Sequence, residues 1–421
     1  MKVIVIAGGQ GTRIASVNSE IPKAMIPVCG KPIIEYEVEL CKRHGFTDFL
    51  FIIGHMGNQI SSYFGNGSKW GVSIDYFQET CPLGTAGALA YLKDKLVEDF
   101  FVLYGDTIVD FDMMAMLKYH QEKKADATLF LHPNDHPYDS DIVQLNPDGK
   151  VVKFDNKPHP DGFVSKNIVN AALFIFSPAI LTQIEVGVKS HIEKEVLPRC
   201  LGAGMNLYGY LSFEYIKDMG TPERYYAVCD DVKSGKVARL NRTNKRPAIF
   251  LDRDGTISKE VNLLNKPNQL ELIEGAAEAI KLINKSDYLA VIVTNQPVIA
   301  RNLCSIEELE YIHATLETML GKEGAYVNDI YYCPHHPDKG YPEERPEFKI
   351  DCECRKPKPG MLLQAANDWN IDLANSYMIG DTTRDLEAGL NAGCKDSILV
   401  ETNKPNALRD VVLQLLKSKL N

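Results

Sequence analysis

The sequence predicts an α/β protein of two domains, each built on a largely parallel β-sheet. Short apolar segments alternate with helical patterns through most of the 421 residues, which is typical of βαβ units. A polar and basic stretch at 233–246 has no apolar periodicity and interrupts that alternation. A new apolar strand then begins, so we expect a first domain over 1–232, a linker over 233–246 and a second domain over 247–421.

The first domain is predicted to contain eight strands and a well-bounded helix. The helix covers about Ile33–His44, and Gly45 is placed to form its C-cap. The predicted strands of this domain are Val3–Ile6, Phe49–Ile53, Val72–Phe77, Phe100–Leu103, Ala127–His132, Val151–Asp155, Ala171–Phe176 and Leu207–Leu211. The second domain repeats the alternation without repeating the sequence, and its predicted strands are Ala248–Leu251, Leu289–Thr294, Asp329–Cys333, Ser376–Ile379 and Ser397–Val400.

Composition and charge argue against several classes of protein. Hydrophobic residues make up 45% of the chain and charged residues 24%, as in ordinary soluble globular proteins. The 46 Lys and Arg against 56 Asp and Glu give a net charge of −10, which disfavours a binder of nucleic acid or of anionic membranes. We see neither a signal peptide nor a membrane-spanning segment and expect a cytoplasmic protein.

The first candidate site is a glycine-rich loop directly after the first strand. Gly8, Gly9 and Gly11 let the backbone approach a phosphate group, and Thr12 and Arg13 follow. The Arg13 guanidinium is suited to bind phosphate oxygens with two hydrogen bonds. The loop matches neither the dinucleotide fingerprint nor a Walker loop, so a plain βα turn is the alternative interpretation.

Further residues of the first domain favour a nucleotide site over a plain turn. Lys23 supplies a cation about ten residues on, and the small residues around Gly84 and Thr85 form a second loop that can receive a base or ribose. Asp106 follows an apolar strand, and Asp218 stands beside a glycine turn. Two such carboxylates are what a Mg²⁺ ion bridging nucleotide phosphates requires, although either one alone is more often an N-cap or turn residue.

The order of these motifs resembles that of the sugar-1-phosphate nucleotidyltransferases over about residues 1–230. The matched segments are AGGxGTR, PKxM, GKPIIEY, LGTAGAL, the Gly105-Asp106 pair, Asn156-Lys157-Pro158, Asn170-Ala171 and DMGTPERY. The resemblance implies a Rossmann-like, GT-A-like domain that uses Mg²⁺. In the implied reaction a sugar phosphate attacks the α-phosphorus of a nucleotide and releases pyrophosphate, which requires positioning and charge neutralisation.

The resemblance also implies a role for each matched residue. The implied positions are Gly8, Gly9, Gly11, Thr12, Arg13 and Lys23 for the triphosphate, Gly84 and Thr85 for the base, Asp106 and Asp218 for Mg²⁺, and Lys157 and Asn170 for the sugar phosphate. Arg13 and Lys23 are the catalytic cations of this set. Within the family, the stretch 16–25 is most similar to heptose-1-phosphate guanylyltransferases, although Ile14 and Ala24 replace the common Leu and Pro. The choice of guanine rests on this analogy alone.

The second candidate site begins directly after the predicted strand Ala248–Leu251, the first strand that follows the linker. Asp252 can attack a phosphorus atom to form an aspartyl-phosphate, and Asp254 can protonate the leaving oxygen and later activate water. Thr294 and Asn295 end another strand and can hydrogen-bond a phosphate. The sequence also supplies positive charge at Arg355 and Lys356, and a further strand-end carboxylate at Asp381 that can hold Mg²⁺ with Asp252.

These elements resemble, in the same order, the haloacid dehalogenase-like phosphatases over about residues 247–421. A pair of aspartates by itself usually belongs to a surface turn, whereas the full set of elements in this order indicates a phosphatase site. The resemblance implies a Rossmannoid domain with Asp252 as nucleophile, Asp254 as acid and base, Thr294 and Lys356 as phosphate ligands, and Mg²⁺ held by Asp381 with Asp252 and Asp254. The resemblance also implies that Arg355 contacts the distal phosphate of the substrate.

Three cysteines and a histidine in the second domain predict a structural zinc site. Cys333 and His335 follow a predicted strand, and Cys352 and Cys354 follow a long polar loop. Three thiolates and one imidazole complete a tetrahedral Zn²⁺ shell without leaving a place for water. His336 competes with His335 as the fourth ligand, and unconnected thiols are the alternative.

This zinc loop resembles that of heptose-bisphosphate phosphatases and their histidinol-phosphatase relatives. One departure concerns Pro297, which stands where the family has a small residue and stiffens a loop expected to hold the substrate. Together the two resemblances imply a bifunctional enzyme whose substrates are GTP and heptose phosphates. Two alternatives stay open: the same reactions on another sugar, such as mannose 1-phosphate, and a domain that serves as a non-catalytic module. We also expect possible self-association into a homo-oligomer, since relatives of the first domain often associate.

Overall fold

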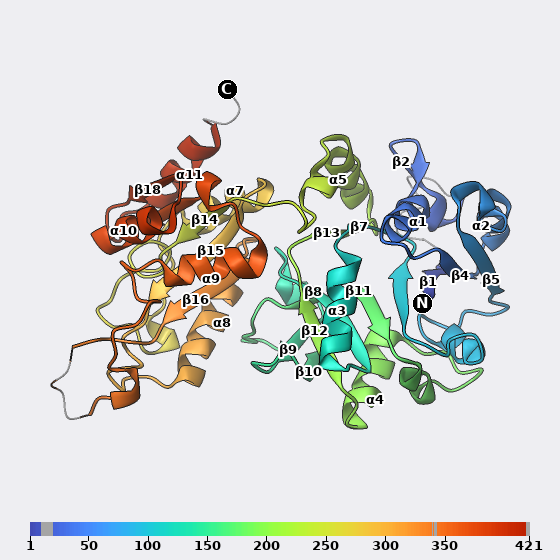
Figure 1. Cartoon of the computed structure of the whole chain (residues 1–421), viewed down its shortest axis with the longest axis horizontal. Coiled ribbons are helices and arrows are strands. Elements are labelled where there is room, and N and C mark those ends of the chain that lie inside the picture. The colour runs from blue at the N-terminus through green and yellow to red at the C-terminus, as the bar shows by residue number, and fades with distance from the viewer. Residues whose placement is uncertain (10–19, 339, 341–342, 418–421) are drawn as a thin grey trace. The chain divides into compact units, whose positions relative to one another are not determined.

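The structure is a computed structural model that describes residues 1–9, 20–338, 340 and 343–417. The chain divides into two compact units (Figure 1). Unit 1 comprises 1–132, 143–156 and 170–241, and unit 2 comprises 133–142, 157–169 and 242–421. The chain passes for the last time from unit 1 to unit 2 after Asn241, inside the range assigned above to the linker. Among the described residues, no helix is long and apolar enough to cross a membrane.

The first half of the chain forms a nine-stranded sheet in which a parallel centre is extended by antiparallel strands. The strands run in the order β10-β9-β11-β6-β1-β4-β5, and β8 joins β11 to β12. Their bounds are β1 (Val3–Ala7), β4 (Asp48–Ile53), β5 (Ser73–Gln78), β6 (Phe100–Tyr104), β8 (Ala127–His132), β9 (Ile142–Leu145), β10 (Val151–Asp155), β11 (Val169–Phe176) and β12 (Leu207–Leu211). The pairs β1·β4, β1·β6, β4·β5 and β8·β12 are parallel, whereas β11 runs antiparallel to β6.

Helices cover the parallel part of this sheet because its strands are apolar on both faces. One core cluster joins strand residues such as Val5 and Phe51 to Val38 of α1, Ile60 of α2 and Met116 of α3. The helices of this half are α1 (Ile33–Arg43), α2 (Gly57–Phe64), α3 (Met113–Lys123), α4 (Leu197–Gly202), α5 (Pro222–Lys233) and α6 (Lys236–Arg239). The predicted helix over 33–44 thus corresponds to α1, which ends one residue earlier.

Two small ribbons that the sequence pattern did not indicate complete unit 1. They are the pair β7 (Thr107–Asp110) with β13 (Tyr215–Asp218) and the pair β2 (Pro27–Val28) with β3 (Lys31–Pro32). A separate core cluster lies beneath them, to which Leu240 of the predicted linker contributes its buried side chain. Asn241 also donates from Nδ2 to Asp110 at 2.8 Å. The first part of the linker range is therefore packed structure, although it lacks an apolar period.

The second half forms a five-stranded sheet that is parallel throughout. Its order is β16-β15-β14-β17-β18, so the first strand along the chain, β14, lies at the centre. Its strands are β14 (Ala248–Leu251), β15 (Leu289–Asn295), β16 (Asp329–Cys333), β17 (Tyr377–Gly380) and β18 (Asp396–Leu399). Its helices are α7 (Ala276–Lys285), α8 (Ile306–Lys322), α9 (Gly360–Trp369), α10 (Thr383–Ala392) and α11 (Ala407–Lys417).

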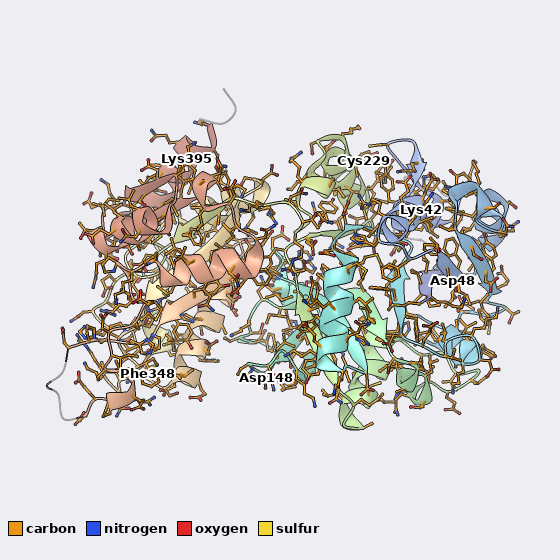
Figure 2. All side chains as sticks on the ribbon, viewed as in Figure 1. Lys42, Asp48, Asp148, Cys229, Phe348 and Lys395 are labelled. Carbon is orange, nitrogen blue, oxygen red and sulfur yellow. The ribbon has the colours of Figure 1, made fainter. Side chains whose placement is uncertain are left out.

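The helices of this sheet lie on both of its faces. Residues of α7, α8 and α11 pack with Leu251 and Ile292 in one core cluster, while α9 contacts β15 and β16 and α10 contacts β17 and β18. Apolar side chains thus fill the space between helices and strands, and charged ones such as Lys42, Asp148 and Lys395 are exposed (Figure 2). The predicted two-domain α/β architecture is confirmed, and every predicted strand is present with its ends shifted by two residues at most.

Candidate active sites

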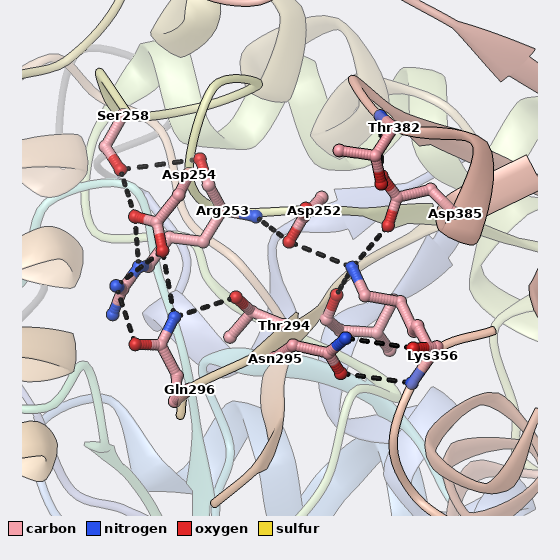
Figure 3. Close-up of polar contacts among 11 residues, drawn as sticks. Asp252, Arg253, Asp254, Ser258, Thr294, Asn295, Gln296, Lys356, Thr382 and Asp385 are labelled. Atoms are coloured by element: carbon pink, nitrogen blue, oxygen red, sulfur yellow. Dashed lines mark hydrogen bonds and ion pairs between the residues drawn. The ribbon is translucent and has the colours of Figure 1, made fainter. Parts of the chain in front are cut away.

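The predicted phosphatase residues meet at the carboxyl edge of the second sheet. Asp252 follows β14, Asp381 follows β17, and Thr294 lies near the end of β15. Because these neighbouring strands are parallel, their carboxyl ends share one edge, where α/β proteins bind their ligands. Figure 3 shows Asp252, Thr294 and Lys356 converging there.

Lys356 is the buried cation of this edge. Its Nζ lies 3.0 Å from Asp252 Oδ1 and 2.5 Å from Asp385 Oδ1, and it donates to the Val293 carbonyl at 2.7 Å. Burial alone would lower the pKa of Lys356, but the two carboxylates raise it above its ordinary value. Burial raises the pKa of Asp252 to about 7, against the lowering effect of Lys356. The lysine therefore stays charged next to the predicted nucleophile.

Asn295 fixes the main chain of this lysine. Its Oδ1 accepts from the Lys356 amide at 3.0 Å, and its Nδ2 donates to the Lys356 carbonyl at 3.1 Å. Thr294 is buried, and its Oγ1 accepts from Gln296 at 2.9 Å. The sequence analysis assigned Asn295 to the phosphate, whereas the structure uses its amide to hold the segment that carries Lys356.

Three carboxylates form a candidate Mg²⁺ site. One oxygen each of Asp252, Asp381 and Asp385 lies within 4.8 Å of the others, and such hard oxygen donors suit Mg²⁺. Asp385 was missed by the sequence analysis, although an acidic residue in the first turn after a strand-end aspartate was a usable signal. Its Oδ2 accepts from the Thr382 amide at 2.9 Å and hydroxyl at 2.7 Å, which caps α10.

Gly255 shows how closely the chain packs around this carboxylate group. Its φ is +79°, and a Cβ at this position would lie 2.1 Å from Asp381 Oδ2. The same Asp381 oxygen accepts from Thr402 at 2.8 Å. Burial raises the pKa of Asp381. A glycine at 255 is therefore required by both the left-handed backbone and the space that Asp381 occupies.

Asp254 lies outside this group of three carboxylates, although the sequence analysis counted it among the metal ligands. Its two oxygens accept hydrogen bonds from Arg253, Gln296 and Ser258 instead. Burial would raise the pKa of Asp254, but the Arg253 charge and these hydrogen bonds lower it below its ordinary value. Sequence reasoning missed Arg253 as a site residue, and it placed Gln296 at a strand end suited to bind phosphate, whereas in the structure the Gln296 side chain contacts Asp254 and Arg253.

The predicted zinc ligands also converge. The ligand atoms of Cys333, His335, Cys352 and Cys354 all lie within 4.8 Å of one another. Cys354 Sγ lies 3.2 Å from the sulfurs of Cys333 and Cys352 and 3.3 Å from His335 Nδ1. Three sulfurs and one nitrogen this close fit a tetrahedral Zn²⁺ ion. His336 is not in the group, and its Nδ1 accepts from the Asp338 amide at 3.2 Å.

Two of the predicted zinc ligands, Cys354 and His335, fix the position of Arg355. Arg355 directly follows Cys354, and its Nη1 donates to the His335 carbonyl at 3.0 Å. The zinc loop thus determines where this guanidinium lies. Pro297 begins a turn in which the Arg301 amide donates to the Pro297 carbonyl at 2.9 Å, and the next residues, Val298 and Ile299, are buried in the core.

The predicted nucleotide site is only partly within the described residues. Gly11, Thr12 and Arg13 lie outside them. Gly8 and Gly9 follow β1, and a Cβ on Gly8 would lie 2.4 Å from Glu79 Oε2, whereas one on Gly9 would meet no atom within 4 Å. A side chain at position 8 would therefore have to displace the end of the Glu79 side chain.

The two predicted magnesium ligands of this site are neighbours across a small ribbon. Asp106 directly precedes β7, Asp218 ends β13, and the Met219 amide donates to the Asp106 carbonyl at 3.1 Å. Lys23 forms an ion pair with Asp106, and Arg224 lies 2.5 Å from Asp218. Burial would raise the pKa of Asp218, but Arg224 lowers it below its ordinary value. The structure thus brings together Lys23, Asp106 and Asp218.

The second small-residue loop, around Gly84 and Thr85, packs against the segment 190–192. Gly84 has a φ of +77°, and a Cβ there would lie 2.3 Å from the Ser190 carbonyl oxygen. Thr85 Oγ1 accepts from the Ile192 amide at 2.8 Å. The two predicted sugar-phosphate ligands fall in different compact units: Lys157, whose Nζ donates to the Asp139 carbonyl at 2.8 Å, belongs to unit 2, and Asn170 to unit 1.

Comparison with known proteins identifies two families along the chain. The Nucleotidyl transferase family matches residues 2–235, and a HAD-hydrolase-like family matches residues 353–411. A UTP–glucose-1-phosphate uridylyltransferase from Synechocystis is 30% identical over 267 residues, which cover 59% of this chain and 68% of that protein. The structure of HddC from Yersinia pseudotuberculosis complexed with GMP-PN aligns with 55% of this chain and 99% of its own, at 24% identity and a TM-score of 0.48.

The second half of the chain is similar to a group of phosphatases. A D-glycero-beta-D-manno-heptose-1,7-bisphosphate 7-phosphatase from Yersinia pestis is 41% identical over 163 residues, covering 39% of this chain and 85% of that protein. The enzyme of the same name from Escherichia coli is 41% identical over 159 residues, covering 38% of this chain and 81% of that protein.

Proposed function

We propose that this chain is a bifunctional enzyme of nucleotide-activated heptose synthesis. It belongs to the nucleotidyl transferase family and carries a HAD-like phosphatase domain C-terminal to the transferase domain. Its second domain would hydrolyse the C7 phosphate of D-glycero-D-manno-heptose 1,7-bisphosphate. Its first domain would then transfer GMP from GTP to the heptose 1-phosphate. The observation that carries the proposal is the 41% identity to heptose-bisphosphate phosphatases within a chain that also begins as a nucleotidyl transferase.

In the phosphatase reaction, Asp252 would attack the phosphorus of the C7 phosphate, and the sugar oxygen would take a proton from Asp254, which must carry that proton when the substrate is bound. Water would then cleave the aspartyl-phosphate, and its proton would return to Asp254. Lys356 and Thr294 would bind the phosphate oxygens. Magnesium held by Asp252, Asp381 and Asp385 would neutralise the negative charge of the phosphoryl group.

In the transferase reaction, an oxygen of the heptose 1-phosphate would attack the α-phosphorus of GTP, and pyrophosphate would leave. Arg13 and Lys23 would compensate the charge of the triphosphate, with the backbone of Gly8, Gly9 and Gly11 close to its oxygens. Asp106 and Asp218 would hold magnesium, which would neutralise the negative charge of the nucleotide phosphates. Gly84 and Thr85 would contact the base, and the matched Thr12, Lys157 and Asn170 would complete the site.

Zinc would hold the loop that carries Arg355, which would bind the distal phosphate of the bisphosphate substrate. Because three thiolates and one imidazole would leave no coordination position for water, we assign zinc a structural role only. The proposed substrates, GTP and sugar phosphates, also favour a cytoplasmic enzyme, and association into a homo-oligomer remains part of the proposal.

A second candidate keeps both reactions and changes the sugar or the base. The 30% identity to a glucose-1-phosphate uridylyltransferase over 59% of this chain favours it. A panel of nucleoside triphosphates and hexose 1-phosphates, including mannose 1-phosphate, distinguishes this candidate. A non-catalytic second domain is disfavoured, because Asp252, Lys356 and Asp381 converge at one sheet edge.

The direct test is to incubate the purified chain with Mg²⁺, GTP and heptose 1,7-bisphosphate and to follow the products by mass spectrometry. We expect phosphate, pyrophosphate and GDP-heptose without an added phosphatase. The variant Asp252→Asn should lose phosphate release by at least about 1,000-fold, since it removes the nucleophile. It should still form GDP-heptose from supplied heptose 1-phosphate. Phosphate release without nucleotide sugar would contradict the choice of GTP or of the sugar.

A further inference from the structure

Both carboxylate oxygens of Asp254 accept hydrogen bonds from neighbouring side chains. Arg253 donates from Nε to Oδ1 at 2.9 Å and from Nη2 to Oδ2 at 2.7 Å. Gln296 donates from Nε2 to the same Oδ2 at 2.9 Å, and its Oε1 accepts from Arg253 Nη2 at 3.0 Å. Figure 3 shows the three side chains joined in this closed arrangement, which we call the Asp254 clamp.

The clamp is fixed from two strands. Arg253 lies in the turn after β14, where the Ser258 amide donates to the Arg253 carbonyl at 2.9 Å and the Ser258 hydroxyl donates to Asp254 Oδ1 at 3.3 Å. Gln296 follows β15, and its amide donates to the Cys333 carbonyl at 2.7 Å. The Gln296 side chain also donates to Thr294 Oγ1 at 2.9 Å. The carboxylate of Asp254 is thus tied to the ends of two neighbouring strands.

Packing alone gives no reason for an arginine at position 253. The side chain is 0% exposed, and its Nη1 has no hydrogen-bond partner among the residues that the structure describes. A buried guanidinium has a large desolvation cost, and apolar residues of similar volume often replace buried ion pairs without loss of stability. What the arginine supplies, and an apolar residue cannot, is a planar pair of donors that fixes the plane and direction of one carboxylate.

We propose that Arg253 and Gln296 are positioning residues that hold the deprotonated Asp254 carboxylate in the orientation in which it takes up the proton of the attacking water beside Asp252. The proposal rests on the proposed phosphatase function of this domain. Neither residue touches the substrate in this scheme, and both act through Asp254. A catalytic group displaced by about 1 Å loses roughly 100-fold in rate, so the effect of the clamp should fall on turnover and not on substrate binding.

The test uses Gln296→Met, which removes the amide at similar volume, and Arg253→Lys, which keeps the charge and loses the paired donors. With the full chain, Mg²⁺ and heptose 1,7-bisphosphate, we expect kcat to fall by about 10- to 100-fold while KM stays within about threefold. The same substitutions in an Asp254→Asn background should cause no further loss, because the residue they position is already gone. A further loss by the same factor in that background would overturn the proposal.

A matched control is Asn284→Leu. Asn284 also bridges two segments of unit 2, since its Nδ2 donates to the Tyr326 carbonyl at 2.8 Å and its Oδ1 accepts from the Tyr326 amide at 3.0 Å. This variant should lower the unfolding temperature and leave kcat unchanged. An equal loss of kcat in the control would show that Gln296 acts only through the stability of the domain, and would overturn the proposal.

If the parent protein releases no phosphate, the proposed phosphatase function is contradicted. The Asp254 clamp can still be tested by a stability measurement that does not depend on activity. A double-mutant cycle of Gln296→Met and Asp254→Asn, read by the unfolding midpoint of the full chain, reports their coupling directly. Non-additive shifts are expected from a shared hydrogen bond. Additive shifts would overturn the clamp itself.

Discussion

Glu37 is the residue whose surroundings least match its chemistry. It lies on α1 next to core residues such as Ile34 and Val38, is 1% exposed, and neither carboxylate oxygen has a hydrogen-bond partner among the described residues. Burial raises the pKa of Glu37 well above its ordinary value, and the charge of Asp106 adds to this. The folded protein therefore keeps a proton on Glu37 that the unfolded chain loses.

We expect Glu37→Leu to stabilise the protein by about 1–3 kcal/mol near neutral pH, the cost of burying an unpaired polar group. The sign follows from linkage: above the ordinary pKa of glutamate, the folded state binds more protons than the unfolded state, so the free energy of unfolding falls as pH rises. The gain from the substitution should therefore increase from pH 4 to pH 8. Urea unfolding of both proteins across this range measures it, and a gain that shrinks with rising pH would contradict the assignment.

At the scale of elements, the loop at Gly84 depends on a backbone conformation that glycine alone adopts easily. Gly84→Ala would place a Cβ 2.3 Å from the Ser190 carbonyl oxygen at a φ of +77°, and we expect a loss of about 2–4 kcal/mol from strain and displacement. Gly204→Ala is the matched control, because Gly204 has a φ of +75° and no atom within 4 Å of a Cβ. It should lose only about 1 kcal/mol. Equal losses in chemical denaturation would show that the Ser190 contact is unimportant.

The loop that carries the predicted zinc ligands has little regular structure of its own. Between β16 and α9 the described chain has one short 3-10 helix, Pro346–Phe348, and little core of its own. We expect Cys352→Ser to lower bound zinc from about one equivalent to near zero and to lower the unfolding temperature. Cys394→Ser alters a buried thiol outside the cluster and should retain the zinc. Zinc retained by the Cys352 variant in elemental analysis would rule out this ligand set.

At the scale of the whole molecule, the two active sites should work independently. Asp252 and Asp106 lie in separate compact units. We expect a mixture of Asp252→Asn and Asp106→Asn proteins to form GDP-heptose from heptose 1,7-bisphosphate, because the released 1-phosphate diffuses between molecules. Either variant alone should form less than about 1% as much, since each lacks an essential carboxylate. Failure of the mixture, with each remaining activity confirmed separately, would indicate that the intermediate does not leave the enzyme.

The sequence by itself determined the α/β alternation, the positions of the strands of the two main sheets other than β9, and the residues that follow those strands. It could do so because buried parallel strands appear as continuous apolar runs, because Asp252 and Asp381 follow such runs closely, and because three cysteines lie near a histidine in one segment. It missed the ribbon of β7 and β13, whose pairing joins segments more than 100 residues apart. No local pattern encodes such a pairing.

Only the tertiary structure decided which partners the polar residues find. From the sequence alone, Arg253 is expected to be an exposed charged residue in a turn, yet it is fully buried and forms an ion pair with Asp254. Asn295 reads as a phosphate ligand, yet it holds the Lys356 backbone. Asp385 enters the carboxylate group because α10 begins beside β14 and β17. Sequence specifies the chemistry a residue can perform, whereas its orientation and burial depend on contacts between distant segments.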